Sequence, residues 1–213
     1  KDKVGVYGNG LPPNDATAWN NYIRAFITEL VERYGKERVL KWRFRVGSEI
    51  DTRPQHWAAT REEFFDHYRN TVAAIKTVLP SAKVGAHFRE ASHKSRYIDY
   101  TGNKEDAYAP HFVSWAKENN VPYAFLAISY YPHITHPHEM DMERVYANQI
   151  APILEHADYN PEASFEIHEY KFIVKMKRAG FVSVATSHNS AFFAMLGKMM
   201  LTHNIKEVFQ WGN

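Results

Sequence analysis

The fold is decided by the stretch Trp42-Arg43-Phe44-Arg45-Val46-Gly47-Ser48-Glu49. Its apolar residues alternate with arginines and a glycine, which is the period of a half-buried β-strand. We expect that strand over residues 39–49. It ends on a carboxylate, Glu49, where a merely solvated charge is less expected, because strand ends of this kind carry the chemistry in parallel α/β barrels. Glu49 is therefore the first candidate for a functional residue.

The alternation of strands and helices continues along the whole chain. An apolar stripe from Trp19 to Tyr34 predicts the first helix, which Asp15 precedes and Gly35 ends. Thr60 and Glu63 have the spacing of a capping box at the start of the second helix. Further helices are expected over 110–119, 141–156 and 189–201, the middle one kinked or divided at Pro152, and further strands over 83–88, 123–131, 164–170 and 207–211. Five strands that alternate with helices predict a parallel α/β sheet.

Two parallel architectures compete, an open doubly wound sheet and part of a (β/α)8 TIM barrel. A doubly wound sheet should offer a phosphate-binding glycine turn. Gly8-Asn9-Gly10 lacks the third glycine of that motif and follows only a weak strand. The barrel is favoured because side chains that can act in catalysis or binding gather at the carboxyl ends of the predicted strands.

Those strand ends carry two carboxylates that indicate sugar chemistry. They read Gly47-Ser48-Glu49, Ala86-His87-Phe88-Arg89, Ser129-Tyr130-Tyr131, His168-Glu169-Tyr170 and Gln210-Trp211. A pair of carboxyl groups is the equipment of glycoside hydrolysis, in which one protonates the leaving oxygen and the other attacks or activates water. We expect Glu49 and Glu169 to form that pair. Glu166 is a rival, but strand alternation sends it to the opposite face from Glu169, so we interpret it as a helix-facing or structural charge.

Composition narrows the function further. The 213 residues include 45% hydrophobic and 23% charged residues, which are values of a globular protein. The net charge of +2 argues against a nucleic-acid partner, and the absence of cysteine excludes disulfides and thiolate sites. The sequence has no run of about 18 apolar residues, which a membrane-spanning helix would need. Because the chain opens at Lys1 rather than Met, we expect a processed or trimmed N-terminus, and a secreted or periplasmic location is favoured.

The chain resembles the clan A glycoside hydrolases, and most closely family 39, the β-xylosidase and α-L-iduronidase family. The resemblance rests on Pro12-Pro13-Asn14-Asp15, Trp19, Arg33-Tyr34-Gly35 and the strand block that ends at Glu49. It implies that residues 1–213 are part of a single (β/α)8 catalytic domain and cover about its fourth to eighth strands. The first three β/α units and the last helix would then come from the same or another chain.

The resemblance also implies roles for individual residues. Glu49 would be the acid/base, and Glu169 would be the nucleophile of a retaining double displacement on an oligo- or polysaccharide. Tyr131 would position the nucleophile, and Trp211 would form the floor of the sugar subsite. Further candidates for substrate binding are Ser48, His87, Arg89, His133 and His168. No cofactor and no metal are expected, and carbohydrate is the expected partner.

The sequence departs from the family pattern beside the acid/base. Ser48 stands where the clan has an asparagine that bonds the sugar 2-hydroxyl, and Gly47 stands where the family has a tryptophan. These shorter residues should widen the subsite, and Arg45 and Arg89 should make it more basic. A wide, basic pocket suits an anionic sugar, sulfated or uronic, and a xylose-type substrate is the other reading.

Two further function classes stay open. Imidazoles gather after the predicted strand that ends at Tyr131, in His133, His136 and His138, and such a cluster can bind zinc or nickel in a metal-dependent barrel hydrolase. Pro137 prevents a helical metal motif there, which favours a polar loop over the cleft. The other alternative is a barrel that binds carbohydrate without catalysis. The presence of both Glu49 and Glu169 argues for the enzyme.

Overall fold

The computed structural model describes residues 10–89, 108–132, 141–171 and 187–211. Five strands form one sheet in the order β1-β2-β3-β4-β5, and all neighbours are parallel. The strands are β1 (Arg43–Val46), β2 (Lys83–Phe88), β3 (Phe125–Tyr130), β4 (Ser164–Tyr170) and β5 (Glu207–Gln210). Strands that pair in chain order form consecutive units of a (β/α)8 barrel, whereas the order of a doubly wound sheet reverses at a switch point. The predicted barrel architecture is confirmed for this part of the chain.

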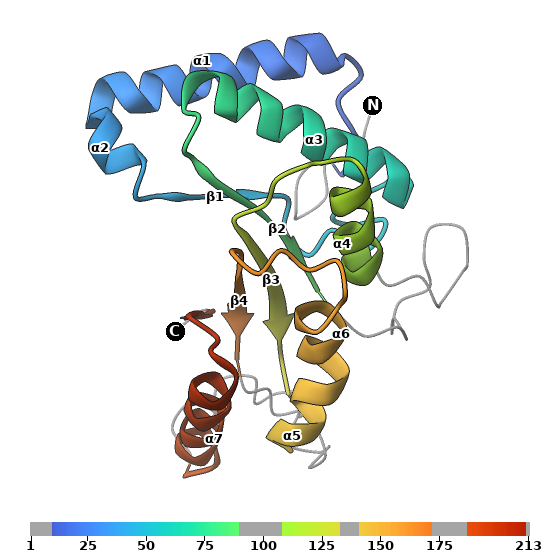
Figure 1. Cartoon of the computed structure of the whole chain (residues 1–213), viewed down its shortest axis with the longest axis vertical. Coiled ribbons are helices and arrows are strands. Elements are labelled where there is room, and N and C mark those ends of the chain that lie inside the picture. Colours follow the sequence, from blue (N-terminus) through green and yellow to red (C-terminus); the bar gives the residue numbers. More distant parts are fainter. Residues whose placement is uncertain (1–9, 90–107, 133–140, 172–186, 212–213) are drawn as a thin grey trace, which may run out of the picture.

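Helices follow the strands and form an outer layer against the sheet (Figure 1). They are α1 (Ala16–Tyr34), α2 (Lys36–Val39), α3 (Arg61–Val78), α4 (Tyr108–Glu118), α5 (Met142–Val145), the π-turn η2 (Tyr146–Ile150), α6 (Ala151–Leu154) and α7 (Ser187–His203). The long helix α1 packs on α3, α3 contacts α4, and α4 contacts α6. Among the described residues, none of the helices is long and apolar enough to cross a bilayer.

The hydrophobic core lies between the helices and the outward side chains of the strands. Val84 and Phe88 of β2, and Leu126 and Ile128 of β3, are buried there together with the apolar faces of α3 and α4. Gly85 faces the other way, where a Cβ would lie 2.2 Å from the carbonyl oxygen of Phe125. The concave inner face therefore carries the polar and glycine positions, as the alternation along each strand requires.

Two elements differ from the sequence prediction. The strand expected over 39–49 is shorter, because α2 and a turn take up its first residues and β1 ends at Val46. The helix expected over 141–156 is divided, but the break precedes Pro152. The amide of Ala151 donates to the carbonyl of Tyr146, five residues back, in a π-turn. Since Pro152 has no N–H to continue the α-helical ladder, the distortion falls in the turn before it.

We predict that the capping box of α3 contributes measurably to stability. The Thr60 hydroxyl accepts a hydrogen bond from the Glu63 amide at 3.2 Å, and the Glu63 carboxylate accepts one from the Thr60 amide at 2.8 Å. Thr60→Ala should lower the free energy of unfolding by about 1 kcal/mol, measured by urea denaturation. Thr77→Ala, at an exposed site of the same helix, is the matched control and should change it by less than about 0.5 kcal/mol. Equal effects of the two variants would contradict the prediction.

Candidate active site

A tight turn after β1 carries the first candidate carboxylate. Gly47 and Glu49 both have positive φ, 76° and 47°. A Cβ on Gly47 would lie 2.3 Å from Cγ2 of Ile50 and 3.4 Å from Phe64, so only glycine fits. That direction points into the core under α3. The expectation that Gly47 widens the sugar subsite is therefore wrong, because its missing side chain leaves room for Ile50 instead.

A β-bulge in β4 places the second carboxylate. Ile128 of β3 pairs with Ile167, but the next residue, Ser129, pairs with Glu169, so β4 has one extra residue at His168. Paired residues of neighbouring strands share a face. Glu169 therefore lies on the same inner face as Ser129, although strict alternation from His168 would have turned it outward.

The bulge also overturns the expected direction of Glu166. This residue was predicted to face the helices, but its carboxylate lies on the concave face, 2.9 Å from Nε of Arg43 and 2.7 Å from Nε2 of His168. Arg43 also reaches Glu207 at 3.4 Å. An arginine of β1 can contact β4 and β5 only across the inside of the curved sheet. The expectation of a structural charge holds, since Glu166 is fully buried among these partners.

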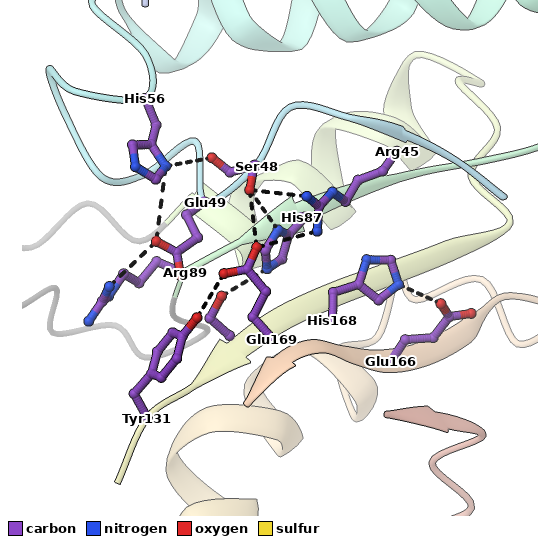
Figure 2. A network of polar contacts seen from close by, with 11 residues as sticks. Arg45, Ser48, Glu49, His56, His87, Arg89, Tyr131, Glu166, His168 and Glu169 are labelled. Carbon is purple, nitrogen blue, oxygen red and sulfur yellow. Dashed lines mark hydrogen bonds and ion pairs between the residues drawn. The ribbon is translucent and has the colours of Figure 1, made fainter. Parts of the chain in front are cut away.

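The carboxyl ends of the strands surround a cavity of about 540 Å³. Its lining consists of Ser48, Glu49, His56, Arg89, Tyr131, Glu169 and Trp211, and Figure 2 shows the side chains around the two carboxylates. Six of the seven were candidates from the sequence. His133, His136 and His138 lie outside the described residues.

Glu169 is surrounded by hydrogen-bond donors. The Tyr131 hydroxyl donates to Oε2 at 2.8 Å and the Ser48 hydroxyl to Oε1 at 3.4 Å, while Nη1 of Arg45 lies 3.6 Å from Oε1. Burial, followed by the hydrogen bond to Glu169 and the negative charge of both glutamates, raises the pKa of Tyr131. The phenol therefore stays protonated and donates its hydrogen bond to Glu169.

Glu49 has different surroundings. It is 6% exposed, and its Oε2 lies 3.4 Å from Nη1 of Arg89 and 4.0 Å from Nδ1 of His56. Its Oε1 is buried and makes no hydrogen bond within the described ranges. The two carboxyl groups of the pocket thus differ in their hydrogen-bond partners, although an arginine lies near each of them.

His56 was not among the candidates from the sequence. Its Nδ1 lies 2.7 Å from the carbonyl oxygen of Ser48, and because a carbonyl only accepts, Nδ1 carries the proton. This bond braces the turn between Gly47 and Glu49. His56 belongs to the irregular segment between β1 and α3, where no periodicity or motif marks a residue as functional.

Two predicted sugar-binding histidines lie beneath the pocket rather than in its wall. His87 has no exposed surface, with Nε2 2.9 Å from the Ser129 hydroxyl and Nδ1 3.4 Å from the Ser48 hydroxyl. Burial, with a smaller contribution from the charge of Arg45, lowers its pKa well below the usual value, so it is neutral. His168 is held against Glu166. Of the two, His87 contacts a residue of the cavity lining, Ser48.

Comparisons with known proteins identify relatives of the chain. The model of the glycosyl hydrolases family 39 matches residues 2–161. An alpha-1,4-L-rhamnosidase of Formosa agariphila is 38% identical over 212 residues, which cover 99% of this chain and 41% of that protein. A beta-xylosidase of Caldicellulosiruptor saccharolyticus is 30% identical over 125 residues, which cover 59% and 23%. The chain thus spans less than half the length of these relatives.

Solved structures share the fold at low sequence identity. A glucosidase from Croceicoccus marinus superposes with a TM-score of 0.70 at 20% identity, over 95% of this chain and 39% of that chain. A monomeric beta-xylosidase from Caulobacter crescentus gives 0.65 at 18% identity, over 96% and 40%. These likenesses support the barrel architecture described above.

We predict that Glu166 supports the fold rather than the chemistry. Burial acts to raise its pKa, but hydrogen bonds from His168, Ser164 and Arg43 outweigh burial and hold the pKa below the ordinary value. Glu166→Gln should therefore lower the free energy of unfolding by about 2 kcal/mol at neutral pH, because a buried charged partner is lost.

The pH dependence of that loss follows from the depressed pKa. The charged form stabilises the folded state fully above the unfolded-state pKa of about 4.3. The stabilisation disappears as the pH falls through the lower folded-state value. Denaturation curves of wild type and Glu166→Gln should therefore converge in acid. A difference that grows as the pH falls would contradict the prediction.

Proposed function

The chain belongs to glycosyl hydrolase family 39, and from that membership we propose that its protein is a retaining glycosidase with Glu49 as acid/base and Glu169 as nucleophile. The observation that carries the proposal is a pair of carboxylates in one cavity that differ in their hydrogen-bond partners. Glu169 accepts from Tyr131 and Ser48, whereas Oε1 of Glu49 has no such partner in the part of the chain that the structure describes.

In the first step, an oxygen of Glu169 forms a bond to the anomeric carbon as the glycosidic bond breaks. Glu49 gives its proton to the departing oxygen, so the leaving group is released as an alcohol. In the second step, Glu49 takes a proton from water, and the water oxygen replaces Glu169 at the anomeric carbon. Two displacements at one carbon restore the starting configuration. The donors Tyr131 and Ser48 stabilise the carboxylate that Glu169 becomes again on release.

For the sugar that is cleaved, we propose an L-rhamnoside. The relative named as an alpha-1,4-L-rhamnosidase aligns with 99% of the chain at 38% identity, whereas the beta-xylosidase aligns with 59% at 30%. A xyloside is the second candidate on the strength of that relative. A carbohydrate-binding barrel without catalysis is less well supported, because it would have no use for two carboxylates in such different surroundings.

We also propose an anionic substituent, sulfate or carboxylate, near the cleaved bond. Arg89 lines the cavity, and Nη1 of Arg45 lies 3.6 Å from Oε1 of Glu169, so two guanidinium groups lie beside the two carboxyl groups. Arg89 also lies over the Tyr131 ring at 5.7 Å from its centroid, and Lys171 lies at the same distance from the Trp211 ring. Cationic groups over an aromatic wall suit a sugar that carries an anion.

The two catalytic roles are tested by separate variants. Glu169→Ala should lower kcat by roughly three orders of magnitude or more, and azide should restore turnover with a glycosyl azide of inverted configuration. Glu49→Gln should lower kcat/KM about 10²- to 10⁴-fold on poor leaving groups, while activated aryl glycosides still react in the first step.

A ligand-bound structure should place the two carboxyl groups about 5 to 5.5 Å apart, the retaining separation. Glu162→Gln, at an exposed site, is the matched control and should leave both constants unchanged. NMR of the first-formed anomer must show retention in wild type. Inversion, or normal turnover by either variant, removes the retaining assignment.

The substrate is tested with matched sugars. Among aryl glycosides, hydrolysis of the L-rhamnoside should exceed that of the xyloside. An oligosaccharide with its anionic group should be preferred over the same compound without it, and Arg89→Ala should reduce that preference about tenfold, the worth of one charge-assisted hydrogen bond. Because Arg89 also contacts Glu49, the measured quantity is the ratio between the two compounds. Lys206→Gln, an exposed cation outside the cavity, should keep the ratio, and a wild type that prefers the neutral sugar defeats the anionic proposal.

A further inference from the structure

His87 lies at the centre of a hydrogen-bond chain that ends on the proposed nucleophile. It is fully buried between two serines, with Nε2 2.9 Å from Oγ of Ser129 and Nδ1 3.4 Å from Oγ of Ser48. Oγ of Ser48 in turn lies 3.4 Å from Oε1 of Glu169 and 3.2 Å from Nη2 of Arg45 (Figure 2). Three strand ends therefore meet at the single hydroxyl of Ser48.

The chemistry of the partners fixes the direction of each bond. A carboxylate only accepts and a guanidinium only donates, so the Ser48 hydroxyl gives its one proton to Glu169 and receives one from Arg45. An unprotonated Nδ1 of His87 would then point a lone pair at the lone pairs of Ser48. In this arrangement Nδ1 carries the imidazole proton, and Nε2 accepts from the Ser129 hydroxyl.

The other tautomer would break the chain. With the proton on Nε2, His87 would donate to Ser129, and Nδ1 would accept from Ser48. The Ser48 hydroxyl would then turn away from Glu169, which would lose one of its two hydroxyl donors. Since a serine hydroxyl rotates freely about its C–O bond, a neighbouring group must select its direction.

We propose that His87 is a positioning residue that, as its Nδ1–H tautomer, holds the Ser48 hydroxyl on Glu169, while its Nε2 contacts the Ser129 hydroxyl. The inference rests on the proposed role of Glu169 as nucleophile. The bond from Ser48 matters most in the second step, when negative charge returns to the carboxylate as the sugar leaves. Ser48 stands where the resembling family has an asparagine, whose amide donors are fixed without help. The serine gains the equivalent order from His87.

Two variants of His87 distinguish the role of Nδ1 from that of Nε2. The amide nitrogen of His87→Asn takes the place of Nδ1 and can still donate to Ser48, whereas that of His87→Gln takes the place of Nε2 and cannot. On a substrate with a fast first step, we expect kcat to fall about tenfold for His87→Gln and Ser48→Ala and within about threefold for His87→Asn. A purely structural role would damage the Asn and Gln variants alike.

A double-mutant cycle provides the decisive measurement. Adding His87→Gln to Ser48→Ala should cause no further loss of kcat, because the histidine acts only through that hydroxyl. Additive losses overturn the proposal. If His87→Gln fails to fold, Ser129→Ala replaces it in the same cycle, since it removes the hydrogen-bond partner of Nε2 and keeps the imidazole. Nitrogen-15 spectra of labelled histidine in the whole protein should show His87 protonated at Nδ1, and a proton on Nε2 also overturns it.

Failure of the proposed function is distinguishable from failure of this inference. If Glu169→Ala keeps full activity or is not rescued by azide, the nucleophile has been assigned wrongly. If that rescue succeeds while the cycle gives additive losses, Glu169 keeps its role and the positioning role of His87 is refuted.

Discussion

The site depends on one extra residue in β4. Two arginines of β1, Arg43 and Arg45, lie two positions apart and reach across the concave face to two glutamates of β4, Glu166 and Glu169, which lie three positions apart. Two equal ladders of alternating side chains cannot match a spacing of two with a spacing of three. The bulge at His168 removes the mismatch, and both arginine–glutamate pairs form on the same face.

The ion pair between Arg43 and Glu166 helps to position the pair between Arg45 and Glu169. Arg43 binds Glu166 and Glu207, so β1, β4 and β5 are fixed to one another across the interior. A buried ion pair contributes little net stability, because desolvation offsets most of the attraction. Its value here lies in geometry. It sets the separation of the strands that carry Glu49 and Glu169, and a displacement of about 1 Å between such groups can cost about a hundredfold in rate.

The sequence was sufficient for the architecture and for bringing two candidate carboxylates, Glu49 and Glu169, to one cavity. Clean alternation and strong helix stripes gave β2 and β4 their full bounds, and the rule that barrel chemistry sits at strand ends selected Glu49 and Glu169. The sequence was insufficient to predict the face of the sheet on which individual side chains lie. Nothing in the residues around His168 marks a bulge, so alternation turned Glu166 the wrong way. Gly47 was interpreted by its missing bulk, although its positive φ and the position of Ile50 explain the glycine.

The departures from the family pattern are best understood together with their neighbours. Ser48 in isolation is a short residue that has lost the amide of an asparagine. In the structure its hydroxyl lies between Arg45, His87 and Glu169, and each of these partners constrains the direction of its proton. His87, expected at the sugar, is instead buried behind that hydroxyl. An asparagine amide has donors whose directions are fixed by its own planar geometry. A serine hydroxyl rotates, so its direction is set by the residues that contact it. On the proposed mechanism, the serine at position 48 therefore depends on His87 for the order that an asparagine amide has by itself.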